Sequence, residues 1–241
     1  LEVARSCANL KAIVNITTDK CYENDGRSEG YKEDDKMGGY DPYSSSKGCA
    51  EIVASAYRRS FLQDQGVGLA SVRAGNVIGG GDWANDRLIP DILRSFEKNE
   101  PVVIRNPKAT RPWQHVLEPL SGYLILAQKL YEDQKEYAEG WNFGPNEKDV
   151  KPVDWILNKM IAKWPNSSWE LDSSSNPHEA NFLQLDISKA ESKLGWKPIW
   201  ELSHTLEKII DWHQAWINKE DMQTVCLSEI KAYMADMNNE V

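Results

Sequence analysis

Long apolar runs are missing from this sequence. Stretches such as LILA at 124–127 stay far below the roughly 18 residues that a membrane-spanning helix needs. Positive charge is also scarce, because 28 Lys and Arg stand against 37 Asp and Glu and leave a net charge of -9. A surface of this sign repels nucleic-acid phosphates and anionic lipids. We therefore expect neither a nucleic acid nor a membrane as a partner.

Cysteine and histidine are few and scattered. The four cysteines show no C-x-x-C spacing, and the four histidines form neither an H-x-x-x-H pair nor a Cys/His group, so we expect no metal site. With 241 residues, 41% of them hydrophobic, the chain can bury a core without disulfides. The cysteines are therefore expected to be free thiols, in a protein of the reducing cytoplasm.

Short β-rich runs alternate with helical patterns through much of the chain. Strands or extended runs are predicted at 11–16, 67–74, 102–105, 111–116 and 141–143, and helices at 43–66, 87–99 and 117–131. The glycine-rich segment 75–83 is predicted to be a loop. Beyond residue 144 we predict helices at 153–164, 202–217 and 222–234, with extended pieces near 169–171 and 182–185. This order predicts an α/β protein with a parallel sheet, followed by a smaller α+β lobe.

Tyr43 and Lys47 are one helical turn apart at the start of the predicted helix 43–66. An ammonium beside a phenol stabilises the phenolate, which can then act as a base near neutral pH. The spacing alone is weak evidence, because Tyr131 and Lys135 repeat it at a polar helix end, where a solvated face is the plainer explanation. The context of Tyr43 is what distinguishes it.

That context is the triplet Thr18-Asp19-Lys20, which follows the predicted strand 11–16. On its own, the triplet is best explained as a turn with a surface ion pair. Parallel sheets, however, bind ligands at the carboxyl ends of their strands. We therefore expect the triplet to share a crevice with Tyr43 and Lys47.

Five longer motifs follow this set in order: VRAGNVIGGGDW, RLIPDI, RPWQHV, GWNFGP and LDISKAESKLGWKP. Together with the triplet and the Y-x-x-x-K pair, they make most of the chain resemble the extended short-chain dehydrogenase/reductase superfamily, in its NAD-dependent epimerase/dehydratase family. The Thr-Asp-Lys triplet is similar to that of the sugar-nucleotide dehydratases. Lys20, where dTDP-glucose dehydratases have Glu, favours CDP-glucose as the substrate. The resemblance implies NAD as cofactor and a homodimer or homotetramer.

It also implies catalytic roles for Thr18, Asp19, Lys20, Tyr43 and Lys47, of which Tyr43 and Lys47 also bind the cofactor. Tyr43, activated by Lys47, would take the C4 hydroxyl proton while NAD receives the hydride, and Thr18 would hydrogen-bond the same oxygen. Asp19 would protonate the departing C6 hydroxyl and Lys20 would be the base at C5, although the sequence leaves these two roles interchangeable. Hydride return to C6 would give a 4-keto-6-deoxy sugar.

Several later positions match the family's substrate site. Without the resemblance, Asn76 would be interpreted as a turn-former and Arg111 as a surface charge; with it, both are expected to meet the sugar nucleotide diphosphate. Trp83, in the glycine-rich loop, is a candidate to touch the substrate. The further residues implied to bind the nucleotide are Leu88, Arg105, His178 and Glu179.

The resemblance divides the chain by function. Residues 1–144 are predicted to be the carboxyl-terminal part of a Rossmann-like, doubly wound NAD-binding domain with substrate-binding loops at 75–116, and residues 145–241 mostly a substrate-binding lobe with terminal helices. The family's first strand, glycine-rich turn and helix, which hold the cofactor pyrophosphate, find no match here. We therefore expect an amino-terminal part to be missing and the 241 residues alone to be inactive.

Two alternatives stay open. A sugar-nucleotide C4 epimerase would need Thr18, Tyr43 and Lys47 but has no task for an Asp19-Lys20 acid/base pair. A non-catalytic sugar-nucleotide-binding module would need none of the five.

Overall fold

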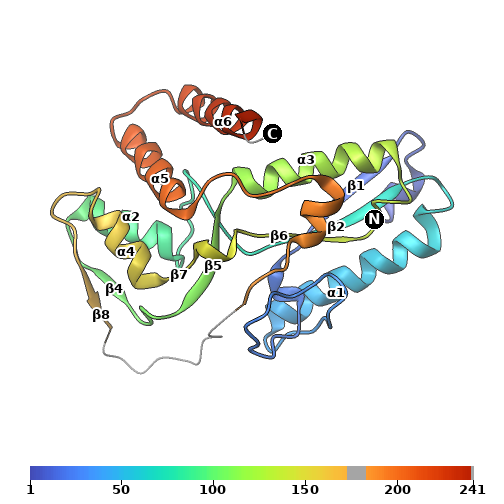
Figure 1. Ribbon diagram of the computed structural model, residues 1–241, viewed down its shortest axis with the longest axis horizontal. Coiled ribbons are helices and arrows are strands. Elements are labelled where there is room, and N and C mark those ends of the chain that lie inside the picture. Colours follow the sequence, from blue (N-terminus) through green and yellow to red (C-terminus); the bar gives the residue numbers. More distant parts are fainter. Residues whose placement is uncertain (173–182, 240–241) are drawn as a thin grey trace. The chain divides into compact units, whose positions relative to one another are not determined.

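The computed structural model describes residues 1–172 and 183–239, and the chain divides into two compact units (Figure 1). Unit 1 comprises residues 1–75, 118–144 and 183–197. Unit 2 comprises residues 76–117, 145–182 and 198–241. Each unit therefore draws on three separate stretches of the sequence.

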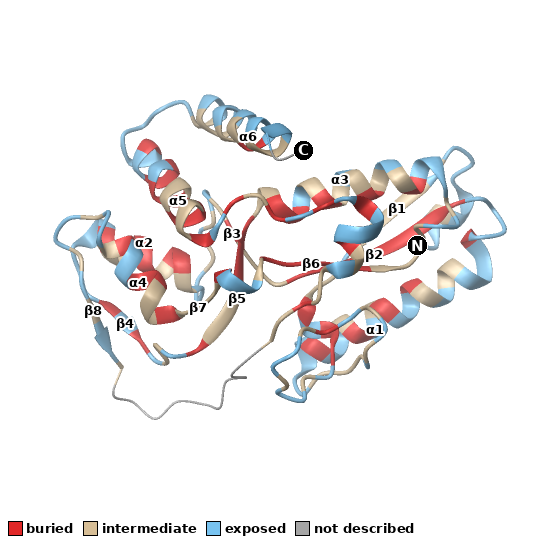
Figure 2. Ribbon diagram, viewed as in Figure 1, coloured by how far each residue is buried: buried red, intermediate tan, exposed pale blue. Residues whose placement is uncertain are grey.

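Unit 1 is built on a parallel sheet in the order β1-β2-β6. Its strands are β1 (Ala12–Ile16), β2 (Gly68–Ala74) and β6 (Gly140–Phe143). The central strand β2 is buried along its whole length (Figure 2), as expected of a parallel strand covered on both faces. Its register is set by pairs such as Ala12 with Gly68 and Ser71 with Gly140.

Two long helices lie on opposite sides of this sheet (Figure 1): α1 (Pro42–Tyr57), which runs into a π-helical turn at Arg58–Leu62, and α3 (Leu117–Glu132). Alternate residues of β2 face the two helices. Leu69 packs in one cluster with Ala54 of α1, whereas Val72 packs in another with Leu126 of α3. A parallel sheet with helices on both faces confirms the predicted doubly wound α/β fold.

Shorter elements complete unit 1. They are the 3₁₀ turns Val3–Ser6 and Asp19–Cys21 and the π-helical turn Ala190–Leu194. A small hairpin-like excursion follows β1, with Tyr22 bridged to Met37, and Tyr31 forms a bridge with Leu185.

Unit 2 is of the α+β type. One sheet has the order β3-β5-β7, in which β3 and β5 are parallel and β7 is antiparallel, and a second sheet pairs β4 with β8. The strands are β3 (Asn76–Ile78), β4 (Val102–Ile104), β5 (Thr110–His115), β7 (Val150–Pro152) and β8 (Trp169–Leu171). The helices are α2 (Leu88–Lys98), α4 (Val153–Ile161), α5 (Leu202–Ile217) and α6 (Met222–Asn239). A 3₁₀ turn at Glu147–Asp149 leads directly into β7.

One apolar core fills unit 2. Buried side chains of α2, α4 and α5 meet those of β4 and β5, with Phe96, Ile156 and Ile209 among the most buried. The apolar positions three and four apart on these helices supply the buried faces. Helix α6 packs on this body through Tyr233, whose ring lies edge-on to Trp200 at 5.0 Å between centroids.

The predicted elements match the structure closely, with three instructive differences. The glycine-rich segment 75–83 is not all loop, because Asn76–Ile78 forms β3 against β5. The helix predicted over 43–66 ends its regular part at Tyr57 and closes with a π-helical turn. Helix α6 runs on to Asn239, beyond the predicted end at 234.

Candidate active site

The first half of the candidate site is the turn after β1. Thr18 caps the 3₁₀ turn Asp19–Cys21: its hydroxyl donates to Asp19 Oδ1 at 2.9 Å and accepts from the Lys20 amide at 3.4 Å. Asp19 is 4% exposed, whereas Lys20 is exposed. The turn lies at the carboxyl edge of the parallel sheet, because the Thr17 amide still donates to Val72 O of β2 at 2.9 Å.

The second half is the first two turns of α1. Asp41 caps this helix by accepting from the Ser44 amide at 3.0 Å and from the Ser44 hydroxyl at 2.6 Å, and these bonds lower the pKa of Asp41. Pro42 occupies the first turn, where its missing N–H costs nothing. The cap thus fixes where the helix begins, and with it the positions of Tyr43 and Lys47.

Tyr43 is where the two halves meet. Its ring centre lies 5.5 Å from Lys47 Nζ and 5.9 Å from Lys20 Nζ, within the range of cation–π attraction. The residue is 52% exposed, so a ligand can reach it. The structure therefore brings Lys20, Tyr43 and Lys47 together, with Thr18 and Asp19 on the same turn as Lys20. Their catalytic roles stay predictions.

Close packing of backbones holds the turn against α1. A Cβ on Gly48 would lie 3.1 Å from Gly38 O and 3.5 Å from Cys21 O, so glycine here allows the loop to approach the helix. Cys21 itself is fully buried, and burial raises the pKa of its thiol to about 12. Cys21 is therefore a packed side chain and not a reactive thiolate. All four cysteines are free thiols, as predicted.

Beneath the site lies a buried polar network that the sequence analysis missed. Arg73 of β2 forms a bidentate ion pair with Glu51 of α1, with Nε–Oε1 and Nη2–Oε2 distances of 3.0 Å each. The other Arg73 nitrogen, Nη1, donates to the Tyr22 hydroxyl at 2.6 Å, which donates in turn to Asn142 Oδ1 at 2.7 Å. One signal could have revealed it. Arg73 is the only charged residue in the strand GLASVRA, and a buried charge needs a partner.

The predicted substrate-binding residues that the structure describes lie in unit 2. Asn76 opens β3 and pairs in register with Trp113 of β5, two residues beyond Arg111, so Asn76 and Arg111 lie on neighbouring strands. Leu88 begins α2 and packs against the unit 2 core. Arg105 is exposed and lies 3.8 Å from Asp172. His178 and Glu179 lie outside the described residues.

Trp83 has a structural environment that the sequence did not indicate. Its ring lies 4.5 Å from that of Trp216 and 6.4 Å from that of Trp212 on α5. A Cβ on Gly80 would overlap the Trp212 ring, so the glycine-rich loop packs directly on α5. Trp83 thus anchors this loop while remaining 46% exposed.

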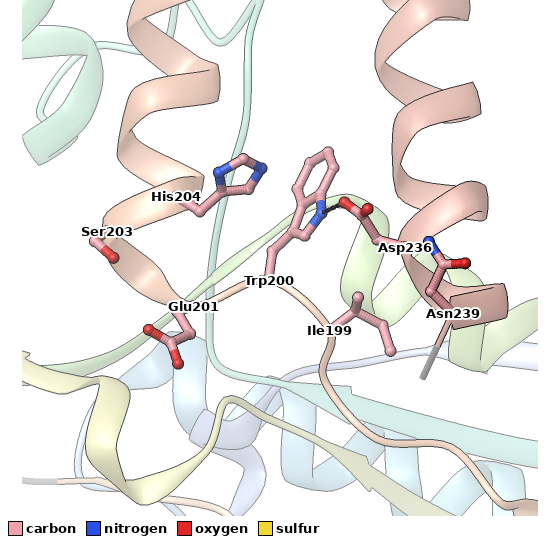
Figure 3. Close-up of a pocket in the computed structure, with 7 residues that line it drawn as sticks. All are labelled: Ile199, Trp200, Glu201, Ser203, His204, Asp236 and Asn239. Carbon is pink, nitrogen blue, oxygen red and sulfur yellow. Dashed lines mark hydrogen bonds between the residues drawn. The ribbon is translucent and has the colours of Figure 1, made fainter. Parts of the chain in front are cut away.

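A separate cleft in unit 2 lies between the start of α5 and the end of α6 (Figure 3). In it, the Trp200 indole N–H donates to Asp236 Oδ2 at 2.8 Å, and His204 lies edge-on to the same indole. Apart from these, its lining consists of Ile199, Glu201, Ser203 and Asn239. None of the predicted site residues within the described part of the chain lines this cleft.

Among residues 1–172 and 183–239, no group of three or more His, Cys, Asp or Glu is arranged to hold a metal ion. Within the same ranges, no helix combines the length and the apolar character needed to cross a bilayer.

A doubly wound parallel sheet with a Tyr/Lys helix at its carboxyl edge defines a Rossmann-like protein of the short-chain dehydrogenase/reductase type. A sequence profile described as GDP-mannose 4,6 dehydratase matches residues 1–209. The chain belongs to this family of sugar-nucleotide dehydratases, which confirms the family predicted from the motifs.

Individual relatives are also sugar-nucleotide dehydratases. The CDP-glucose 4,6-dehydratase of Salmonella typhimurium is 58% identical over 241 residues, covering 98% of this chain and 67% of that enzyme. The dTDP-glucose 4,6-dehydratase of Xanthomonas campestris is 21% identical, covering 85% of this chain and 59% of its own length. This chain thus spans about two thirds or less of these relatives.

Solved structures show the same fold. The dTDP-glucose 4,6-dehydratase of Bacillus anthracis, in complex with NAD, matches with a TM-score of 0.72 and 19% identity over 88% of this chain and 64% of that one. The UDP-glucuronic acid 4-epimerase of Bacillus cereus, in complex with UDP-glucuronic acid and NAD, matches with a TM-score of 0.71 and 21% identity over 89% and 66%. At such identities, the likeness concerns the fold alone.

Proposed function

We propose that the gene product containing these residues is an NAD-dependent CDP-glucose 4,6-dehydratase. The observation that carries the proposal is the turn Thr18-Asp19-Lys20 set against Tyr43 and Lys47, in a chain 58% identical to the Salmonella enzyme of that name. A dehydratase needs an acid and a base beyond the Tyr/Lys pair, and Asp19 and Lys20 supply both.

The residues present fit the nicotinamide end of NAD. Lys47 offers ammonium hydrogens that can bind ribose hydroxyls, and it stands one helical turn from the exposed Tyr43 at the carboxyl edge of a parallel sheet. When bound, NAD would supply the hydride acceptor for oxidation at C4 and the hydride donor for reduction at C6. Cofactor binding by Tyr43 and Lys47 remains part of the proposal.

Each residue of the cluster has a proton to hold or move. Tyr43, beside the Lys47 ammonium, takes the proton of the C4 hydroxyl, and Thr18 hydrogen-bonds the same oxygen. Oxidation at C4 acidifies the C5 proton, which Lys20 removes in its neutral amine form. Asp19, bonded by the Thr18 hydroxyl, gives its proton to the departing C6 hydroxyl. The proposal assigns the acid to Asp19, which is 4% exposed, and the base to Lys20, which is exposed.

Substrate binding by unit 2 is the second part of the proposal. Asn76 and Arg111, on neighbouring strands, are proposed to meet the diphosphate, with Arg105 and the Leu88 backbone as further contacts. His178 and Glu179 complete the proposed set. We further propose a homodimer or homotetramer, and a cytoplasmic location supported by the four free thiols.

The test is product analysis with the full gene product, supplied with NAD and offered CDP-, dTDP-, UDP- and GDP-hexoses in turn. We expect CDP-glucose alone to lose the mass of one water and yield a 4-keto-6-deoxy sugar. An unchanged mass with inverted C4 configuration would identify an epimerase instead. No reaction with any of the four would refute the proposal.

The chain supplies a matched control for the catalytic assignment. Tyr43→Phe should abolish turnover, whereas Tyr131→Phe, which removes the tyrosine of the second Y-x-x-x-K sequence, should leave turnover unchanged because Tyr131 is 65% exposed on α3. Equal turnover in both variants would remove Tyr43 from the mechanism.

A further inference from the structure

Glu51 is a buried carboxylate for which the proposed chemistry has no use. It follows Lys47 by four residues and Tyr43 by eight, so the three side chains run along one side of α1. Tyr43 is half exposed, but Glu51 is only 3% exposed. The same side of the helix therefore passes from the ligand-accessible surface into the interior of unit 1.

Three elements meet at this carboxylate. Arg73, 2% exposed in the centre of the sheet, binds both of its oxygens. The hydroxyl of Thr17 donates to Glu51 Oε1 at 2.5 Å and lies 3.2 Å from Val72 O. Thr17 directly precedes Thr18. A single side chain thus connects the helix of Tyr43 and Lys47, the central strand, and the turn of Thr18, Asp19 and Lys20.

The carboxylate is charged in this environment. Burial acts to raise the pKa of Glu51, but the hydrogen bonds and charge of Arg73, with the Thr17 hydroxyl, outweigh it and hold that pKa below its ordinary value. Stability is a weak explanation for such a pair, since apolar residues of similar size often serve a core as well or better. A charged carboxylate with fixed hydrogen-bond partners is better suited to fixing the position of α1 relative to β2 and to the turn after β1.

We propose that Glu51 is a positioning residue, which sets α1 against the turn after β1 and so holds Tyr43 and Lys47 opposite Thr18 and Lys20. The expected effect on turnover rests on the proposed function. The structural claim, that the Glu51 carboxylate orders the turn after β1, does not depend on it.

The connection between Glu51 and the turn after β1 is short. Glu51 accepts from the Thr17 hydroxyl, and Thr17 directly precedes Thr18. On α1, Gly48, which contacts the loop backbone, lies between Lys47 and Glu51. Loss of the Thr17 bond would let the turn shift while the helix stays capped by Asp41. A misplacement of about 1 Å can cost about 100-fold in rate.

Thr17→Val is the decisive variant, with Thr17→Ser as its partner. Valine keeps the shape of threonine and removes the hydroxyl, without leaving Arg73 unpaired; serine keeps the hydroxyl. We expect kcat on CDP-glucose to fall about 10-fold or more in Thr17→Val with little change in KM, because binding by unit 2 is untouched. Thr17→Ser should restore kcat to near the wild-type value.

Glu51→Gln provides a second and stronger perturbation, with an expected loss of about 100-fold in kcat. It leaves the Arg73 charge unpaired and destabilises unit 1, so it needs a control of equal stability loss. Leu62→Ala serves, because Leu62 is fully buried in the π-helical turn after α1, packs in a cluster with Ala54 and Leu69, and its truncation opens a cavity there. Below its unfolding transition, Leu62→Ala should keep wild-type kcat. An equal fall in kcat would show that instability causes the effect and would overturn the proposal.

Amide hydrogen exchange separates this proposal from the proposed function. Peptides covering residues 17–22 should exchange faster in Thr17→Val and Glu51→Gln, and at the wild-type rate in Thr17→Ser and Leu62→Ala. This result is expected even if the wild-type protein turns over no sugar nucleotide, an outcome that would refute only the proposed function. Unchanged exchange in Thr17→Val, or faster exchange with unchanged kcat in an active protein, would refute the positioning role.

Discussion

Removal of one hydroxyl from the buried network should measurably destabilise unit 1. The change is Tyr22→Phe. The Tyr22 hydroxyl accepts from Arg73 Nη1 at 2.6 Å and donates to Asn142 Oδ1 at 2.7 Å, and both partners are 2% exposed or less. Phenylalanine keeps the ring, which stacks on Tyr31 at 5.3 Å, so only these two bonds are lost.

The magnitude follows from the character of the two bonds. A bond from a charged donor contributes about 1.5–3 kcal/mol and a neutral one about 0.5–1.5 kcal/mol. Arg73 keeps its bonds to Glu51 and to Glu33 O, which limits the loss at that end. We therefore expect the free energy of unfolding of unit 1 to fall by about 2–4 kcal/mol.

The assay is amide hydrogen exchange of β2, the central strand of unit 1, together with urea unfolding. Tyr123→Phe is the matched control. Tyr123 packs edge-on to Phe143 in the same unit, burial alone raises the pKa of its hydroxyl to about 12, and that hydroxyl makes no hydrogen bond within the described part of the chain. It should change stability by less than about 0.5 kcal/mol. If Tyr22→Phe behaved like the control, the network would contribute nothing to the stability of unit 1.

Three further outcomes are expected. Gly80→Ala should lower the free energy of unfolding of unit 2 by about 1–3 kcal/mol in urea titrations, because the added Cβ would overlap the Trp212 ring; an unchanged midpoint would contradict this packing. In the folded protein, a thiol reagent should modify exposed Cys49 rapidly and Cys21 only on unfolding, and rapid labelling of Cys21 would contradict its burial. The pKa of Glu51 lies below its ordinary value of 4.5, so ionised Glu51 contributes fully to the free energy of unfolding above pH 4.5, and this contribution is lost as pH falls through the folded-state pKa. When the free energy of unfolding is measured against pH, Glu51→Gln should lack this acid-dependent loss. A pH dependence equal to that of the wild type would refute the ion pair.

Regular elements with a clear apolar pattern were predictable from the sequence. The helix at 202–217 was predicted with the bounds that the structure gives α5, because its buried positions recur three and four residues apart and charged residues flank them. The placement of Lys20 beside Tyr43 was predictable too. It needs only a strand end, a helix start and the rule that parallel strands present their carboxyl ends at one edge.

Other features depend on contacts that no local pattern encodes. Asn76–Ile78 lies among glycines and yet forms β3, because β5, more than thirty residues later, supplies its hydrogen-bonding partners. The interleaving of units 1 and 2 has the same origin. The chain leaves unit 1 after residue 75, at the start of the glycine-rich segment, and returns at residue 118, within the first turn of α3.

The buried network shows why a site and its support differ in predictability. Tyr43 and Lys47 can be recognised from their spacing along one helix. The role of Glu51 depends on its contacts with Arg73, 22 residues away on another element, and with Thr17, 34 residues away. In the sequence, Glu51 is a polar residue on a helix that could equally face solvent. Its burial is enforced by Arg73, because a guanidinium inside β2 must find a carboxylate and the side of α1 that carries Tyr43 and Lys47 is the one that can present it. The same requirement that buries the pair therefore also fixes which side of α1 faces the sheet, and so where its tyrosine and lysine stand.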